Sequence, residues 1–257
     1  MKKRILAPLW IIISTFLCIY RPKSIGKEII GFKVSNYLII ISSYLFIAII
    51  IIGSIYFLYK LNIREMISEL GLKKGITKGF LFGLLATLPM TVSSAVLFKV
   101  TDNQFSFYIL MTVFVAPFME EVLFRGYLFG MLFKKVRWGF IPASLIAAVL
   151  FGIGHLYQAH NFSGAVGTFL VTFAGSAWSC WLYVEFENNL WIPIWLHILM
   201  NMSWTVFQTD VPGAIGNNIT NLFRLITIII TVVYTLQYSR KHGRKINKRN
   251  LLVHPVF

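Results

Sequence analysis

The chain has 257 residues, of which 57% are hydrophobic and 13% are charged, and its mean hydropathy is +0.73. Soluble domains carry about a quarter charged residues, so this composition excludes an ordinary soluble protein and predicts an integral membrane protein. The net charge of +15 does not indicate nucleic-acid binding, because the basic residues gather between apolar runs and near the two ends of the sequence, where cytoplasmic loops face anionic lipid.

Eight apolar runs are long enough, or nearly long enough, to span a bilayer. The first follows Met-Lys-Lys-Arg and is similar to a signal peptide, but no small-residue cleavage site closes it, so we expect it to be retained. Between the second and third runs, residues 62–71 have apolar side chains at helical spacing with charges opposite, which predicts an amphipathic helix at the membrane surface. The sequence therefore predicts an all-α polytopic membrane protein of about eight transmembrane helices, with residues 1–257 in a single integral membrane domain. The runs are 5–20, 37–59, 79–98, 107–133, 140–157, 163–184, 190–208 and 222–238.

The basic residues are distributed unevenly between the two sides of this predicted bundle. With the N-terminus inside, most Lys and Arg fall in the inner loops and in the tail from Arg240 to Arg249, and few fall in the outer loops, at residues 21–33 and Lys99. Because Lys and Arg in short loops favour the cytoplasm, we expect both termini to be cytoplasmic, in a bacterial plasma membrane. The basic loops and tail are expected to contact anionic lipid.

The fourth run carries three ionisable residues, Glu120, Glu121 and Arg125, in the middle of an apolar stretch. Each such residue at the bilayer centre costs about 3 kcal/mol or more unless it is paired. On a helix Glu121 and Arg125 are four residues apart and share a face, so they can pair. Glu120 points about 100° away and has no partner on its own helix, so another helix must supply one.

Two later runs carry polar residues that could meet Glu120. The fifth run has Phe151 and His155, and the seventh has His197 and Asn201, each pair at a spacing of four residues. At about 1.5 Å of rise per residue, Glu120, His155, His197 and Asn201 fall at similar depths in the membrane. We therefore expect these side chains to converge from three helices.

Such a group of side chains suits a hydrolase that acts on a carbonyl. A carboxylate can take a proton from water, and an imidazole beside it can orient that water. A second histidine with a neighbouring amide can stabilise a developing oxyanion. We predict Glu120, His155, His197 and Asn201 as catalytic residues. Glu121 and Arg125 are expected to support them, with Phe151 packing against His155.

A divalent metal such as Zn²⁺ is the alternative use of the same side chains. Glu120, His155 and His197 could bind zinc and leave a fourth position open. The sequence contains no H-E-x-x-H motif, and if Glu120 were a ligand, the remaining nearby base, Glu121, would already be occupied by Arg125. Both alternatives stay open at this point.

The motifs E-E-x-x-x-R, F-x-x-x-H and H-x-x-x-N occur in this order on separate apolar runs. This series resembles the CAAX-protease and bacteriocin-processing family, also called the Abi family, and is similar to type II CAAX prenyl endopeptidases. The resemblance covers about residues 107–208 as a motif core. It implies an eight-helix intramembrane endopeptidase in which Glu120 and the histidines activate water, and His197 and Asn201 hold the oxyanion. The family has been interpreted both with and without a metal.

The predicted function is therefore hydrolysis of a peptide bond in a membrane-associated peptide or protein substrate. Two alternatives from other classes are a non-catalytic bacteriocin-immunity or scaffold protein of the same fold, and a proton-coupled transporter in which Glu and His form a relay. A structural alternative for Glu120 is an ion pair with Arg224 of the last run. No nucleic-acid partner is expected.

Overall fold

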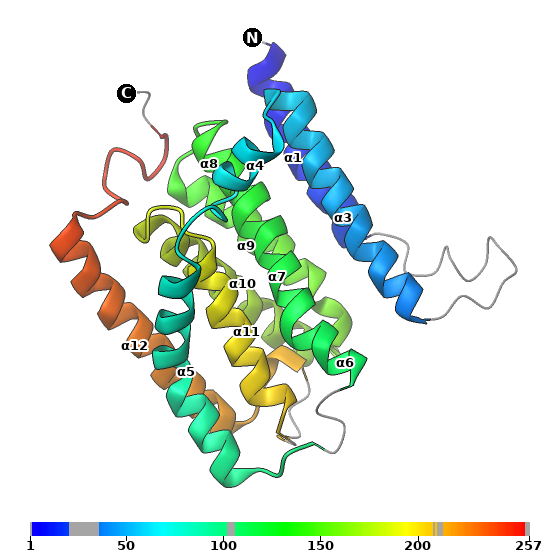
Figure 1. Cartoon of the computed structure of the whole chain (residues 1–257), viewed down its shortest axis with the longest axis vertical. Coiled ribbons are helices and arrows are strands. Elements are labelled where there is room, and N and C mark those ends of the chain that lie inside the picture. Colours follow the sequence, from blue (N-terminus) through cyan, green and yellow to red (C-terminus); the bar gives the residue numbers. More distant parts are fainter. Residues whose placement is uncertain (1, 21–35, 102–105, 208, 210–212, 255–257) are drawn as a thin grey trace, which may run out of the picture.

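A computed structural model describes residues 2–20, 36–101, 106–207, 209 and 213–254 of the chain (Figure 1). Over these residues the chain is almost entirely helical and contains no β-strand. The expected outer loop at residues 21–33 lies outside the described residues. The helices are α1 (Lys2–Ile19), α3 (Asn36–Tyr59), α4 (Ile63–Glu69), α5 (Ile76–Leu97), α6 (Phe107–Leu110), η1 (Met111–Val115), α7 (Ala116–Glu121), η2 (Val122–Phe129), α8 (Gly130–Lys134), α9 (Phe140–Gly154), η3 (Leu156–Gln158), α10 (Phe162–Glu185), α11 (Trp191–Thr205), η4 (Gly213–Ile215) and α12 (Asn218–His242).

The predicted all-α membrane architecture is confirmed, although fewer than eight helices have full spanning length. Among the described residues, five helical segments are long and apolar enough to cross a bilayer, namely α3, α5, α9 with η3, α10 and α12. The other expected spans are the short α1, the divided run from α6 to α8, and α11, which has 15 residues. Hydropathy overestimates the lengths of these three helices, because it does not show where a helix ends or where its hydrogen-bond pattern changes.

The amphipathic helix expected near residues 62–71 is α4. Asn62 and Glu65 form a capping box, in which Glu65 N donates to Asn62 Oδ1 at 3.0 Å and Asn62 N donates to Glu65 Oε2 at 2.8 Å. Met66 is buried against the bundle, whereas Ile63 and Ile67 are exposed. The helix therefore packs along one side and keeps apolar surface for the membrane interface.

The run that carries the two glutamates, residues 107–134, is continuous but irregular. The π-helical segments η1 and η2 flank α7 on both sides, and every residue of η2 is buried. Such segments are rare and occur frequently at functional sites. The irregular run thus identifies the part of the bundle where a site is expected.

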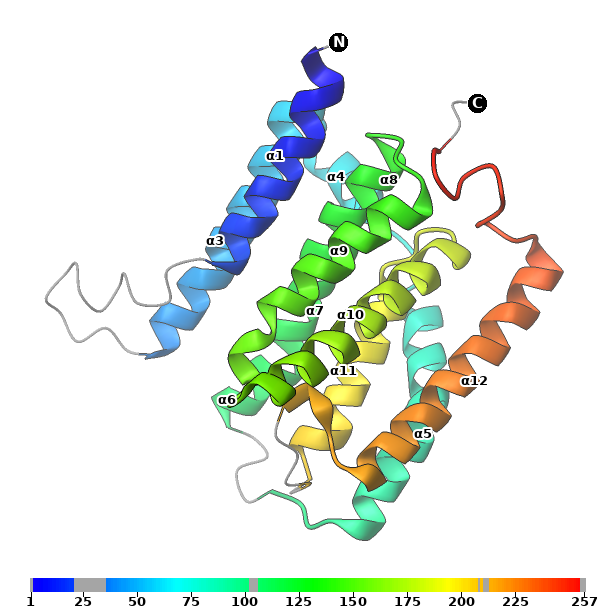
Figure 2. The same cartoon turned by 180° about the vertical axis from the view of Figure 1, so that it is seen from behind.

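The three motif-bearing parts of the chain are neighbours in space. α11 contacts both α5 and α7, and α9 contacts both η2 and α10. The hairpin of α1 and α3 stands at one edge of the molecule, and α12 stands at the opposite edge beside α5 (Figures 1 and 2). The motif core is therefore packed between these two outer layers.

α5 and α11 approach each other closely because two glycines of α5 face α11. A Cβ at Gly79 would lie 2.3 Å from the Trp191 carbonyl oxygen, and a Cβ at Gly83 would lie 3.1 Å from Leu196 N. Small residues spaced by four are typical of tightly packed membrane helices. This packing fixes the position of α11, which carries His197.

The segment after α12 packs against the bundle through hydrogen bonds. The buried Glu185 carboxylate accepts the Ser239 hydroxyl at 2.5 Å and the backbone N–H groups of Lys245 and Ile246 at 3.3 and 3.2 Å. Further along, the carbonyl groups of residues 250–252 accept the N–H groups of residues 139–141 at the start of α9. The segment thus connects the end of α12 to the beginning of α9.

Candidate active site

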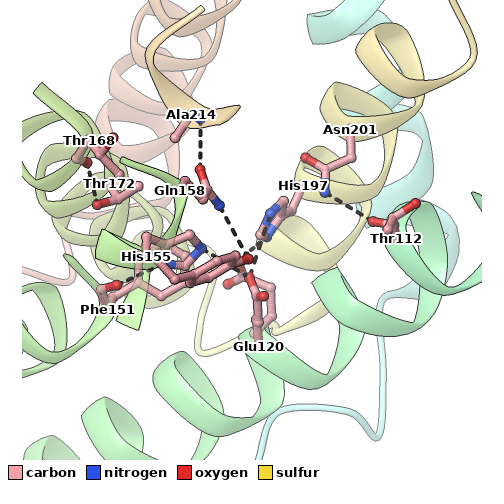
Figure 3. A network of polar contacts seen from close by, with 12 residues as sticks. Thr112, Glu120, Phe151, His155, Gln158, Thr168, Thr172, His197, Asn201 and Ala214 are labelled. Carbon is pink, nitrogen blue, oxygen red and sulfur yellow. Dashed lines mark hydrogen bonds and ion pairs between the residues drawn. The ribbon is translucent and has the colours of Figure 1, made fainter. Parts of the chain in front are cut away.

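Glu120 faces two imidazoles that come from two other helices. Glu120 Oε2 on α7 lies 3.8 Å from His155 Nε2, which follows α9, and 4.0 Å from His197 Nε2 on α11. Figure 3 shows the three side chains converging. Their side chains are 31%, 14% and 24% exposed, so the group is partly accessible rather than sealed in the core. The partner that Glu120 lacks on its own helix is therefore supplied by this pair of histidines.

His155 is held by the turn that precedes it. Its Nδ1 donates to the Phe151 carbonyl oxygen at 2.7 Å, and the two rings lie 4.2 Å apart between centroids. Because a carbonyl oxygen only accepts, Nδ1 carries a proton, and Nε2 is the ring nitrogen that faces Glu120. The predicted packing of Phe151 against His155 is present.

His197 is held by the neighbouring glutamate. Its Nδ1 lies 2.8 Å from Glu121 Oε1, which also lies 3.2 Å from Arg125 Nη1. Glu121 and Arg125 are both buried, and Arg125 places its guanidinium 4.3 Å from the centre of the Phe151 ring. Glu121 does more than neutralise Arg125, because it also orients the imidazole of His197.

Asn201 lies one turn beyond His197 on α11 and reaches η1. Its Nδ2 donates to the Thr112 carbonyl oxygen at 3.2 Å (Figure 3). An amide nitrogen has two N–H donors, so one remains for another acceptor. The sequence does not predict this contact of Thr112, because the contact uses the backbone carbonyl, which every residue possesses.

Gln158 is a second residue that the sequence analysis did not identify. Its Oε1 accepts the Ala214 N–H at 2.8 Å and its Nε2 donates to the Tyr157 hydroxyl at 3.4 Å. In Figure 3 it extends from η3 toward the group around Glu120. Its position three residues after His155 was the only signal in the sequence.

The proposed ion pair between Glu120 and Arg224 is not formed. Arg224 donates to the carbonyl oxygens of Ala214 and Ile215, each at 2.7 Å, and lies 4.9 Å from the Trp204 ring centre. It therefore fixes the short helix η4 instead of compensating Glu120. This contact could not be expected from the sequence, because it depends on how the loop before α12 folds back.

The three candidate ligands lie slightly farther apart than the donor atoms of a formed zinc centre. Four-coordinate zinc with bonds of about 2.0–2.2 Å would place its donor atoms about 3.4 Å apart. The donor atoms of Glu120, His155 and His197 are 3.8 and 4.0 Å apart. Within the described part of the chain, no group of three or more His, Cys, Asp and Glu side chains has an arrangement suited to a metal ion.

The fold and the site define an integral membrane protein with a carboxylate and two imidazoles at the meeting point of three helices. Residues 101–203 match the family described as type II CAAX prenyl endopeptidase Rce1-like. This part of the chain is therefore similar to that family, which confirms the resemblance predicted from the three motifs.

The chain is also similar to a protein of Bacillus subtilis (strain 168) named "Putative membrane peptidase YdiL". The two are 32% identical over 102 residues, which represent 40% of this chain and 37% of that protein. The similarity thus spans well under half of either chain.

Proposed function

We propose that this protein is an intramembrane endopeptidase that hydrolyses a peptide bond with water activated by Glu120 and His155. The observation that carries this proposal is the convergence of His155 Nε2 and His197 Nε2 on one carboxylate oxygen of Glu120. The match of residues 101–203 to the type II CAAX prenyl endopeptidase Rce1-like family supports the same reaction class.

The nucleophilic water binds between Glu120 and His155. The distance of 3.8 Å between Glu120 Oε2 and His155 Nε2 is too long for a direct hydrogen bond and suits a bridging water. In the proposed resting state His155 is the neutral ring with its proton on Nδ1, so both atoms are acceptors. A water that donates one hydrogen to each acceptor keeps its oxygen lone pairs free to attack a carbonyl carbon.

Glu120 transfers a proton from the attacking water to the leaving group. As the water oxygen bonds to the carbonyl carbon, one proton passes to Glu120. When the C–N bond breaks, Glu120 returns this proton to the leaving amine nitrogen, and the products are a carboxylic acid and an amine. Glu120 is again ionised for the next cycle.

The oxyanion is stabilised from α11. His197, protonated on both ring nitrogens, and the remaining N–H of Asn201 supply the donors. With His197 in this form, the charges of Glu120, Glu121, Arg125 and His197 sum to zero, which low-dielectric surroundings favour. Glu121 and Arg125 act as positioning residues, since they hold His197 in place.

We further propose that both termini are cytoplasmic and that the protein lies in a bacterial plasma membrane. The excess of Lys and Arg on one side of the bundle supports cytoplasmic termini, and the similarity to a protein of Bacillus subtilis supports a bacterial plasma membrane. The substrate is a membrane-associated peptide or protein, and the basic loops and tail bind anionic lipid.

The test uses the purified full chain in vesicles with a library of lipidated and unlipidated peptides. Cleavage by Glu120→Gln should fall by about 10²–10⁴-fold, and His155→Ala should also lose activity. Glu187→Gln is the matched control, because Glu187 is exposed and pairs with Lys245 on the surface. Unchanged activity in both site variants would contradict the proposal.

A chelator arm of this experiment addresses the metal alternative. Activity that persists in the chelator supports the water-activating pair alone, whereas loss that is reversed by added Zn²⁺ shows that a metal takes part. If Glu120→Gln preserves the biological effect of the protein at normal protein level, the function is non-catalytic, as in a bacteriocin-immunity or scaffold protein.

A further inference from the structure

A groove with a volume of about 500 Å³ lies between α5 and α12, away from Glu120. Its floor is apolar and buried, while its rims are apolar and about half exposed, so the groove opens at the surface of the bundle. Both helices are long and apolar enough to span a membrane, so the opening faces lipid. The floor is formed by Phe82, Ala86 and Phe186, and the rims by Leu81, Leu85 and Tyr234.

One cation marks the end of this groove. Lys78 lies in the first turn of α5, and its ammonium donates to the Tyr238 hydroxyl at 2.8 Å. The same ammonium lies 4.1 Å from the Tyr238 ring centre and 5.2 Å from that of Phe186. Aromatic contacts therefore hold an exposed positive charge beside the apolar channel.

The charge of Lys78 is not compensated within the described residues. No carboxylate there lies within ion-pair distance of it, whereas Lys134, Lys135 and Lys245 each have a glutamate partner. Lys78 is the basic residue among those that line the groove. An anion is the complementary partner.

We propose that this groove binds one anionic glycerophospholipid. An acyl chain lies along the apolar floor between α5 and α12, and the phosphate group lies at Lys78. A lipid fits both properties of the site, since it joins a long apolar chain to a negative group at the level of the membrane interface. A zwitterionic lipid offers the same chain without the net charge, so it binds more weakly.

The bound lipid supports the helix that carries His197. The floor residues Phe82 and Phe186 belong to a hydrophobic cluster that also contains Ile192 and Leu196 of α11. Leu196 immediately precedes His197. An acyl chain packed on this cluster therefore stabilises the position of α11 from the membrane side.

The test compares phosphatidylglycerol with phosphatidylcholine of the same acyl chains, added to delipidated full-length protein in detergent. Retained lipid is counted by native mass spectrometry, and the melting temperature is measured in parallel. The wild type should retain phosphatidylglycerol about fivefold better than phosphatidylcholine, which corresponds to about 1 kcal/mol for one Lys near the membrane surface. Phosphatidylglycerol should also raise the melting temperature more.

Variants separate the two ends of the site. Lys78→Gln should abolish the preference for phosphatidylglycerol, and Lys78→Arg should keep it. Ile230→Trp, which fills the groove from α12, should reduce retention of both lipids. The matched control is Lys60→Gln, because Lys60 also lies over aromatic rings, those of Tyr56 and Phe57, at the end of α3.

Three results would overturn the proposal. Equal retention of the two lipids by the wild type would show that no anionic group is selected. An equal loss in the Lys78→Gln and Lys60→Gln variants would assign the preference to general surface charge. Unchanged retention in Ile230→Trp would place the lipid elsewhere on the protein.

Discussion

Two adjacent layers of the candidate site differ sharply in their access to the surroundings. Glu121 and Arg125 have side chains that are only 1% and 2% exposed, whereas the Glu120 side chain is 31% exposed. The buried layer contacts other parts of the protein, while the accessible layer is partly open to the surroundings. Neighbouring glutamates thus acquire different roles because a helix directs them to different sides.

The comparison makes distinct predictions for the two layers. Changes in the buried layer should first affect the stability of the bundle, because they leave a charge without compensation. Changes in the accessible layer should first affect the rate of hydrolysis, because in the proposed mechanism these groups act on the transition state.

Removal of Arg125 should give the largest loss of stability. Arg125→Met removes the guanidinium from the buried Glu121 carboxylate and leaves it only the contact with His197, which should destabilise the fold by about 3 kcal/mol. The free energy of unfolding can be measured by denaturant titration in mixed micelles. The double variant Glu121→Gln with Arg125→Met should recover much of the loss, and an absence of recovery would contradict the role assigned to the pair.

Asn201→Ala should mainly reduce kcat. Loss of one oxyanion donor should lower kcat by about 10²–10³-fold, while KM changes little, because the donor acts mainly in the transition state. Steady-state kinetics on a cleaved peptide measure both constants. The melting temperature serves as a control for the lost contact with the Thr112 carbonyl. A rise in KM at unchanged kcat would assign Asn201 to substrate binding instead.

Phe151→Leu tests the connection between the two layers. The substitution preserves an apolar side chain but removes the ring that contacts both the Arg125 guanidinium and the His155 imidazole. Loss of the cation–π contact should destabilise the protein by about 0.5–2 kcal/mol. Activity should also fall, because His155 loses its packing partner. Phe151→Tyr keeps the ring and should retain activity, and equal activity of the Leu and Tyr variants would show that the ring contact is dispensable.

The smallest expected effect concerns Lys134, at the inner end of the divided run. Burial lowers the pKa of Lys134 to about 8, and the nearby Glu69 carboxylate partly opposes this change. Lys134 therefore stays protonated up to a higher pH in the unfolded chain than in the folded protein. The free energy of unfolding should rise by about 1 kcal/mol between pH 8 and pH 9.

The pH effect can be isolated by comparing two lysines. Lys134→Met should remove this rise in stability, as followed by thermal unfolding across the pH range. Lys135→Met is the matched control, because Lys135 pairs with the same Glu69 and is more exposed. A similar pH dependence in the wild type and the Lys134→Met variant would refute the prediction.

Much of the fold and of the candidate site follows from the sequence. Apolar runs predict the helices, and the unsatisfied charge of Glu120 predicts that other helices approach it. The similar depths of His155 and His197 predict where they could meet it. These inferences succeed because they depend on helix periodicity and on the cost of polar groups in lipid, both of which are local in sequence or general in physics.

Other features depend on interactions that a single sequence does not reveal. The π-helical pattern of η2 is a choice among backbone hydrogen bonds that similar residues make in an α-helix. The contact of Asn201 with Thr112 uses a carbonyl group, and the groove at Lys78 arises from the packing of α5 against α12. Both require the relative placement of helices, which hydropathy does not encode.

The carboxylate of Glu185 has a practical consequence for protein engineering. It is buried, and its hydrogen bonds come from Ser239 and from backbone N–H groups just beyond α12. A truncation after His242 would therefore remove the two backbone N–H donors and leave this buried acid with the Ser239 hydroxyl alone. Affinity tags and reporter fusions should accordingly be joined behind residue 254, so that this anchor stays intact.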